Sequence, residues 1–182
     1  MPPRNYGFAE RLGMSHGAAI GVGVEEILKD NVPGAWNVRR ASEQDDRSGT
    51  DFWVERGCGE SLSVDCKIRS QDWSLKGCDD LALETWSVIE RGKVGWTRDS
   101  AKRTDYVLWF WKDTGRWCLI PFPMLCKVFA AKWEAWTRKY KTVQQRTDTY
   151  HSECVFVPRR VVWAAIYKHF GGEGKACYTA AA

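Results

Sequence analysis

The sequence lacks the cysteine patterns that mark zinc sites and secreted disulfide frameworks. Seven cysteines are present, an odd number, with no CxxC pair and no grouping of cysteine and histidine at zinc-ligand spacing. Only three histidines occur, and they share no metal-ligand spacing, so we expect ordinary polar positions for them. These absences argue against a zinc protein. They favour a reducing, intracellular compartment in which the thiols act as small hydrophobic side chains.

Long apolar runs are also missing. The first residues, MPPRNYGFAERLG, contain no apolar signal segment, and the most apolar stretch, 119–133, is broken by residues that include Pro121, Pro123 and Lys127. We therefore expect a cytoplasmic protein with no membrane role. With no internal repeat, low-complexity tract or long linker, we expect residues 1–172 to form a single nuclease-like domain and 173–182 a flexible tail.

Tryptophan is the one residue type that is unusually frequent. Its 11 copies are spread from Trp36 to Trp163, so we expect most of them in the core or at its edge. The composition is otherwise ordinary for a globular protein, and the net charge of +4 permits a polyanionic partner without requiring one. Exposed and contiguous tryptophans would instead indicate a scaffold that binds a protein partner.

The hydrophobic pattern predicts an α/β fold with a mixed sheet flanked by helices. Apolar residues at helical spacing predict helices over 15–29, 123–140 and 158–170, the last of them stopped by Gly171. Alternating or short apolar runs predict strands over 35–41, 51–56, 61–69, 81–89, 106–112, 116–120 and 154–157. We expect the first three strands to form an antiparallel meander, with a polar loop over 43–49.

Two carboxylates and a lysine fall together in this meander. In the strand over 61–69, apolar residues alternate with Asp65 and Lys67, and a period of two places these two side chains on one face. Asp51 begins the preceding strand, across a tight turn, so we expect its carboxylate beside Asp65. Neighbouring carboxylates repel each other, and a divalent cation between them removes that cost.

This arrangement suits phosphodiester hydrolysis. The transition state carries extra negative charge, which Mg²⁺ held by two hard oxygen ligands would neutralise while it activates a water molecule. Asp51 and Asp65 would be the metal ligands, and Lys67 would stabilise charge. The alternative is that the Asp-x-Lys pattern is only the solvated polar face of an amphipathic strand.

The segments 48–51 (SGTD) and 64–67 (VDCK) resemble the signature of the PD-(D/E)XK nuclease superfamily. That signature has an acidic residue at the start of one strand and D/E-x-K in the next, usually after a helix that bears a glutamate. The segment 21–25 (GVGVE) matches the helix through a Gly-x-x-x-Glu arrangement seen in resolvase-like members. The resemblance covers 15–69, and Thr50 stands where the nominal motif has proline.

The resemblance implies a restriction-endonuclease-like fold and Mg²⁺-dependent cleavage of DNA, often by a homodimer, with Mn²⁺ able to replace Mg²⁺. Glu25, Asp51, Asp65 and Lys67 would be the catalytic residues, in an order similar to that of Holliday junction resolvases and phage or restriction-type nucleases. Branched DNA is therefore among the expected substrates. The alternative is an inactive protein of the same fold that binds nucleic acid or acts as an inhibitor, against which the intact acidic and lysine positions argue.

Two carboxylate positions keep open alternatives. Glu25 and Glu26 compete for the helix carboxylate, and helical geometry favours Glu25 because it shares a face with Leu28. Glu84 is either catalytic or one half of a structural salt bridge, for which Lys67 could be the partner.

A basic loop and an aromatic helix are the candidate contact surfaces. Cations with an interleaved aromatic side chain suit phosphate contact combined with base stacking, although charged runs are commonly just solvated. The candidate nucleic-acid contacts are Lys93, Trp96, Arg98, Lys102 and Arg103. The helix after Pro123 carries Phe129, Trp133 and Trp136, which either form a homodimer interface or pack in the core.

Overall fold

The computed structural model describes residues 23–147 and 149–171. The predicted helix start at Ser15, with the glycine of position 21, and the predicted tail over 173–182 therefore lie outside the described residues. The chain divides into two compact units, each built from two segments. The first unit comprises Met1–Asp72 and Lys102–Phe122, and the second comprises Trp73–Ala101 and Pro123–Ala182.

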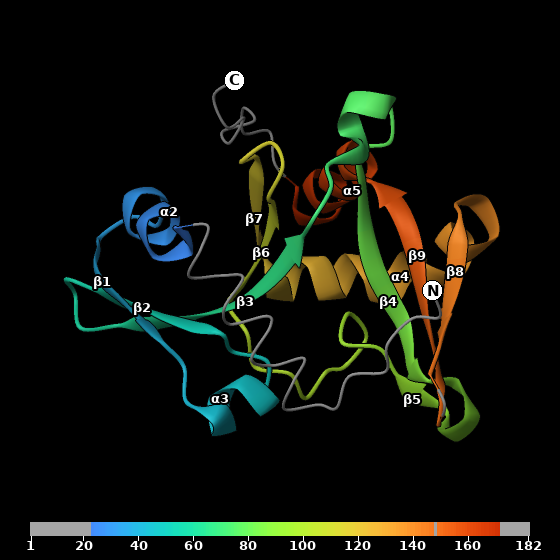
Figure 1. Ribbon diagram of the computed structural model, residues 1–182, viewed down its shortest axis with the longest axis horizontal. Coiled ribbons are helices and arrows are strands. Elements are labelled where there is room, and N and C mark those ends of the chain that lie inside the picture. The colour runs from blue at the N-terminus through green and yellow to red at the C-terminus, as the bar shows by residue number, and fades with distance from the viewer. Residues whose placement is uncertain (1–22, 148, 172–182) are drawn as a thin grey trace. The chain divides into compact units, whose positions relative to one another are not determined.

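The first unit contains a five-stranded mixed sheet, labelled in Figure 1. Its elements are α2 (Val24–Asn31), β1 (Ala35–Arg40), α3 (Glu43–Arg47), β2 (Phe52–Arg56), β3 (Ser61–Arg69), β6 (Tyr106–Trp111) and β7 (Trp117–Pro121). The strand order is β1-β2-β3-β6-β7, in which β3 and β6 run parallel and the other neighbours run antiparallel. The predicted antiparallel meander of the first three strands is confirmed.

The core of the first unit lies between α2 and one face of this sheet. Leu28 of α2 is fully buried in a cluster with Val64 and Cys66 of β3. Because side chains alternate along a strand, the apolar residues of β3 face this cluster while Asp65 and Lys67 belong to the opposite face. A slip by one residue would exchange the two sets, so burial of the apolar side chains fixes the register on which the polar face depends.

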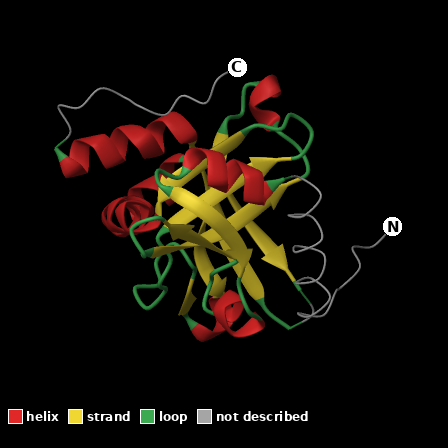
Figure 2. Cartoon of the chain, turned by 90° about the vertical axis from the view of Figure 1, so that its left-hand side faces the viewer, coloured by secondary structure: helices red, strands yellow, loops and turns green. Residues whose placement is uncertain are grey.

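The second unit contains a four-stranded antiparallel sheet, whose strands are labelled in Figure 1. Figure 2 colours the helices red and the strands yellow throughout the described residues. Its elements are η1 (Trp73–Lys76), β4 (Asp80–Val88), η2 (Ile89–Arg91), β5 (Lys93–Val94), nearly all of α4 (Phe122–Lys139), β8 (Thr142–Arg146), β9 (His151–Pro158) and α5 (Arg159–Phe170). The strand order is β5-β4-β9-β8. Helix α5 ends where Gly171 adopts a left-handed conformation, as predicted.

The mixed α/β class, with a mixed sheet flanked by helices, is confirmed, but two predictions about its elements are wrong. The polar segment 43–49 contains a short helix, α3, because the Ser42 side chain caps it by accepting a hydrogen bond from the backbone N–H of Asp45 at 3.2 Å. The strands β4 and β9 do not join the mixed sheet. They pair with each other and, together with β5 and β8, form the second sheet.

Most tryptophans are buried or half-buried, as expected. Only Trp36 and Trp73 are exposed, at 61% and 51%, and they lie on β1 and η1. On α4, Phe129 and Trp136 are buried and contact each other with ring centroids 5.9 Å apart. These two side chains pack within the protein itself rather than on its surface, and the homodimer stays a prediction.

None of the six cysteines in the described ranges forms a disulfide bond. None of the described helices combines the length and the apolar character needed to cross a membrane.

Candidate functional site

Asp51 is held against β3 by backbone hydrogen bonds. It follows the turn after α3 and directly precedes β2, and its own N–H donates to the carbonyl of Val64 at 2.8 Å. Its carboxylate Oδ2 accepts a hydrogen bond from the N–H of Cys66 at 2.5 Å. The side chain of Asp51 therefore reaches the residue next to Asp65 in sequence.

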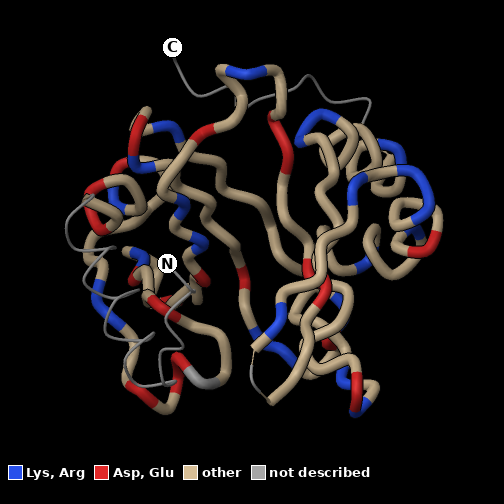
Figure 3. The backbone as a smooth tube through the Cα atoms, turned by 45° about the vertical axis from the view of Figure 1, so that its right-hand side comes forward, with Lys and Arg blue, Asp and Glu red and all other residues tan. Residues whose placement is uncertain are grey.

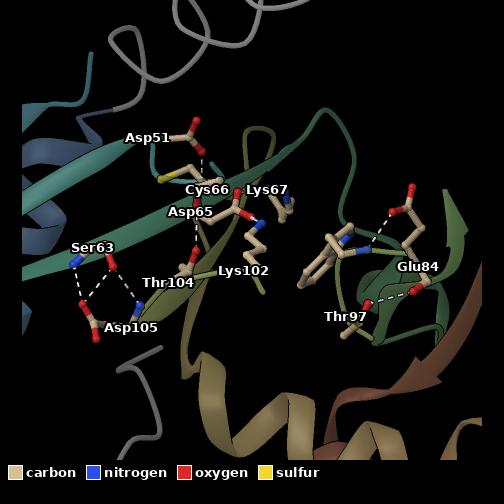
Figure 4. A network of polar contacts seen from close by, with 12 residues as sticks. Asp51, Ser63, Asp65, Cys66, Lys67, Glu84, Thr97, Lys102, Thr104 and Asp105 are labelled. Atoms are coloured by element: carbon tan, nitrogen blue, oxygen red, sulfur yellow. Dashed lines mark hydrogen bonds and ion pairs between the residues drawn. The ribbon is translucent and has the colours of Figure 1, made fainter. Parts of the chain in front are cut away.

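Asp65 is a buried carboxylate that pairs with two ammonium groups, as Figure 4 shows. Its side chain is 3% exposed. The Nζ of Lys67 donates to Oδ1 at 2.7 Å, and the Nζ of Lys102 donates to Oδ2. Both oxygens of the carboxylate therefore carry a charged partner, one from β3 itself and one from the segment before β6.

The two aspartates of this cluster have opposite pKa shifts. Burial opposes ionisation of Asp65, but the ammonium groups of Lys67 and Lys102 outweigh it and hold the pKa of Asp65 below its usual value. Burial and the negative charge of Asp65 raise the pKa of Asp51 to about 7. Burial disfavours the charged form of Lys67, yet the Asp65 carboxylate outweighs burial and raises the pKa of Lys67. Asp51 is thus the carboxylate whose charge is poorly compensated.

The segment that carries Lys102 is tied to both acidic strands. The hydroxyl of Thr104 donates to the carbonyl of Gly49 at 2.8 Å, just before Asp51. The carboxylate of Asp105 accepts hydrogen bonds from the N–H and the hydroxyl of Ser63 on β3, at 2.7 and 2.8 Å. These contacts, drawn in part in Figure 4, fix the position from which Lys102 reaches Asp65.

The two aspartates offer the hard oxygen donors that divalent ions such as Mg²⁺ and Mn²⁺ accept. Mg²⁺ is commonly held by one or two carboxylates and completes its shell with water, which Asp51 and Asp65 could supply between them. A carboxylate oxygen has room for two acceptor contacts, so the pairing of Asp65 with two lysines leaves capacity on each oxygen. Within the described ranges no set of three or more acidic, histidine or cysteine side chains is placed to hold an ion.

Glu25, the predicted helix carboxylate, does not join the aspartate pair as a third ligand among the described residues. Its side chain is 53% exposed, and its Oε1 lies 3.9 Å from the Nε of Arg40 on β1. Glu26 is exposed as well. The buried face of α2 is formed by Val24 and Leu28, four residues apart, and both glutamates fall outside it.

In the second unit, Glu84 holds the turn that follows β5. Its Oε2 accepts a hydrogen bond from the N–H of Trp96 at 2.9 Å, and its backbone carbonyl accepts one from the Thr97 hydroxyl at 3.0 Å. A Cβ at Gly95 would stand 2.2 Å from that carbonyl oxygen, so only glycine permits this close approach. This carboxylate has a structural partner inside its own unit.

Arg98 is packed into the second unit by aromatic side chains. Its guanidinium lies 3.8 Å from the ring centroid of Trp133 and 4.5 Å from that of Trp86. It also donates to the carbonyl of Thr85 at 3.1 Å. Arg98 therefore has an evident packing role, and the ring faces it covers are not open for base stacking.

The five candidate nucleic-acid contacts are divided between the two units. Lys93 on β5 and Arg103 are exposed, but they belong to different units, and Trp96 is half-buried. Lys102 is only 7% exposed and binds Asp65, a partner that its position in a basic loop did not suggest. Sequence reasoning had no signal for this pairing, because the two residues are brought together only by the pairing of β3 with β6.

Arg69 is a further polar residue of β3 that was not among the predicted site residues. It is exposed at the end of β3 and lies on the same face as Asp65 and Lys67, because it follows them at a period of two. The alternation that identified Asp65 and Lys67 could have identified it too.

Comparison with known proteins adds no relative to this geometry. The chain matches no protein-family model, no curated protein and no solved structure. What the cluster of Asp51, Asp65, Lys67 and Lys102 can do follows from its own chemistry.

Proposed function

We propose that this protein is a Mg²⁺-dependent endonuclease of the PD-(D/E)XK kind that hydrolyses phosphodiester bonds in DNA. The observation that carries the proposal is the pairing of a buried, lysine-bound carboxylate, Asp65, with a second carboxylate, Asp51, whose pKa is raised to about 7. A poorly compensated carboxylate beside another one destabilises the protein. Such arrangements are typical of functional sites, where a bound cation removes the cost.

The proposed role of each aspartate and lysine in the cluster follows from its charge. Asp51 and Asp65 would hold the ion, which when bound supplies charge stabilisation to the phosphodiester and activates water. Lys67, whose pKa is raised, keeps its proton at neutral pH. It therefore acts as a cation that stabilises negative charge on a phosphate oxygen, rather than as a base that removes a proton from water.

Charge balance explains how a bound metal ion would strengthen the attraction of this cluster for DNA. Two ionised aspartates and two lysines have a formal charge of zero, and a divalent ion raises it to +2. A cation-rich site of this kind attracts the phosphodiester backbone. Basic residues are interspersed with acidic ones along the chain in Figure 3, and the exposed Arg69 and Arg103 belong to the same unit as the cluster.

Holliday junctions and other branched DNA are the substrates that the acidic-residue order favours, with Mn²⁺ as a substitute for Mg²⁺. Two symmetric cuts in a junction would require two sites, which a homodimer with twofold symmetry provides. The intracellular location inferred from the thiols suits a DNA substrate.

The test is a cleavage assay on branched, duplex and single-stranded DNA, with Mg²⁺ or with EDTA. We expect cleavage only with Mg²⁺. Asp65→Asn should abolish cleavage and leave DNA binding intact, because it removes a metal ligand together with a repulsive charge. Lys67→Ala should lose turnover but retain metal binding, and Lys112→Ala, at an exposed lysine of the same unit, should behave as wild type. Full activity of Asp65→Asn would refute the proposal.

The pairing of Asp65 with two ammonium groups favours a second candidate, a non-catalytic protein of the same fold that binds nucleic acid. In that case the cluster is satisfied without metal, and its role is structural. No cleavage of any DNA under any metal condition, combined with salt-dependent binding, would support this second candidate.

A further inference from the structure

Lys102 is an unusual residue to find buried. Lysine is almost never fully buried unless it is paired, and the Lys102 side chain is 7% exposed. Its ammonium binds Asp65 and lies 5.4 Å from the ring centroid of Phe122. The ammonium of Lys67 alone balances the single negative charge of Asp65. The ammonium of Lys102 is therefore not needed to neutralise this carboxylate.

The Lys102 side chain lies against a glycine, Gly49, which has no side chain to block it. Gly49 has a φ of +93°, and a Cβ at this position would stand 2.2 Å from Cε and 2.7 Å from Nζ of Lys102. The hydroxyl of Thr104 binds the carbonyl of the same glycine. The end of the Lys102 side chain therefore packs directly against Gly49, in the turn before Asp51.

The two lysines of the cluster differ in how easily they can leave Asp65. The Lys67 side chain is 24% exposed, so its ammonium can exchange the carboxylate for water at small cost. The Lys102 ammonium, at 7% exposure, must move out of a buried position before it is solvated. Lys102 is thus the more persistent occupant of the carboxylate.

We propose that Lys102 is a built-in competitor of the divalent cation. Its ammonium occupies Oδ2 of Asp65 in the metal-free protein, and a divalent ion must displace it to use this oxygen. This proposal rests on the proposed function, since it requires an ion at Asp51 and Asp65. It assigns to Lys102 control over the metal concentration at which the site fills, because charges of the same sign that share one carboxylate oppose each other.

Calorimetric titration of the full chain with Mn²⁺ alone tests the proposal without an activity readout. Lys102→Met should bind Mn²⁺ more tightly than wild type, by on the order of tenfold, because it keeps the bulk of the side chain and removes the competing charge. Lys67→Met should show a smaller gain. Lys112→Met, at an exposed lysine of the same unit, should match wild type.

A second variant guards against loss of folding. Lys102→Gln removes the charge but can still donate a hydrogen bond to Asp65, so it should fold even where Lys102→Met does not. Circular dichroism of each variant confirms its fold before titration. Lys102→Gln should also bind Mn²⁺ more tightly than wild type.

The outcomes separate this inference from the proposed function. If wild type binds Mn²⁺ and the folded Lys102 variants bind it equally or more weakly, the competitor role of Lys102 is overturned. The nuclease proposal then stays intact. Weaker binding in these variants would make Lys102 a residue that orients Asp65. An absence of Mn²⁺ binding in wild type and in the folded Lys102 variants overturns both proposals, whereas binding by the variants alone supports the competition.

Discussion

Gly49→Ala is the substitution that most directly probes how the turn before Asp51 and the buried lysine depend on each other. The φ of +93° at Gly49 is unfavourable for any residue with a Cβ. The new Cβ would also overlap the end of the Lys102 side chain, 2.2 Å from its Cε. Since that side chain is flexible and the backbone is not, the lysine should give way and lose its contact with Asp65.

The expected magnitude has two parts. The backbone strain of a left-handed alanine costs about 1–2 kcal/mol. Loss of a hydrogen bond to the charged, buried Asp65 costs about 1.5–3 kcal/mol more. Gly49→Ala should therefore lower the free energy of unfolding by about 2.5–5 kcal/mol.

Urea denaturation, followed by circular dichroism, measures this loss. Gly59→Ala is a matched control, because Gly59 belongs to the same unit and has a φ of +86°, yet a Cβ there would meet nothing within 4 Å. It should show the backbone cost alone, about 1–2 kcal/mol. It also corrects for the reduced chain entropy of an unfolded protein that has gained an alanine.

A double-mutant cycle with Lys102→Ala decides whether the steric argument is right. With no atoms beyond Cβ at position 102, the overlap is gone, and Gly49→Ala should cost only as much as Gly59→Ala. Additive effects of the two substitutions, within about 0.5 kcal/mol, would refute the claim that Gly49 makes room for Lys102.

Three further predictions concern stability. Because burial and the charge of Asp65 raise the pKa of Asp51 from 3.8 to about 7, the native state keeps a proton that the unfolded chain has lost. The free energy of unfolding of the metal-free protein should thus fall by at most about 4 kcal/mol as pH rises from 3.8 to about 7. Urea denaturation across this range should show that this fall is absent in Asp51→Asn. Arg116→Ala should lower the free energy of unfolding by about 3–5 kcal/mol in the same assay, because Arg116 donates two hydrogen bonds to the carboxylate of Asp72, whose side chain is 2% exposed. A decrease of less than about 1 kcal/mol would contradict this. Leu28→Ala should cost about 2–5 kcal/mol in thermal or urea unfolding, against less than about 0.5 kcal/mol for the exposed neighbour Lys29→Ala.

The strand that carries the candidate site could be predicted because its two faces differ. In β3, apolar residues pack against α2, and the polar residues between them bind Asp105, Lys102 or each other, so a period of two is present over nine residues. Asp51 could be placed from the short turn that joins β2 to β3. These are local relations, and local patterns indicate them directly.

Other elements had no local signal of this kind. Helix α3 depends on one capping side chain, Ser42, and its five residues are too few for an apolar period to be recognised. Strand β8, with sequence TVQQR, is mostly exposed, so it has no apolar alternation, and only its pairing with β9 reveals it. The division of the strands into two sheets follows from that pairing and cannot be inferred from the strands one at a time.

The sequence identified Asp51, Asp65 and Lys67 as members of the candidate site, but it did not indicate that Lys102 joins them. Lys102 was assigned to a basic loop because its neighbours in sequence are basic. In the structure its ammonium binds Asp65, because the parallel pairing of β3 with β6 brings the two residues together. Glu25 was favoured because it lies three residues before Leu28, but the buried face of α2 follows the four-residue spacing from Val24 to Leu28. Both placements depend on tertiary packing, which a local pattern does not contain.

The most direct test of the central claim is a crystal structure of the protein with Mn²⁺, in which anomalous scattering locates the ion. We predict a peak bonded to carboxylate oxygens of both Asp51 and Asp65, with the ammonium of Lys102 displaced from Oδ2 of Asp65. A well-ordered crystal soaked in Mn²⁺ that has no peak at these aspartates, and in which both lysines still bind Asp65, would contradict the account.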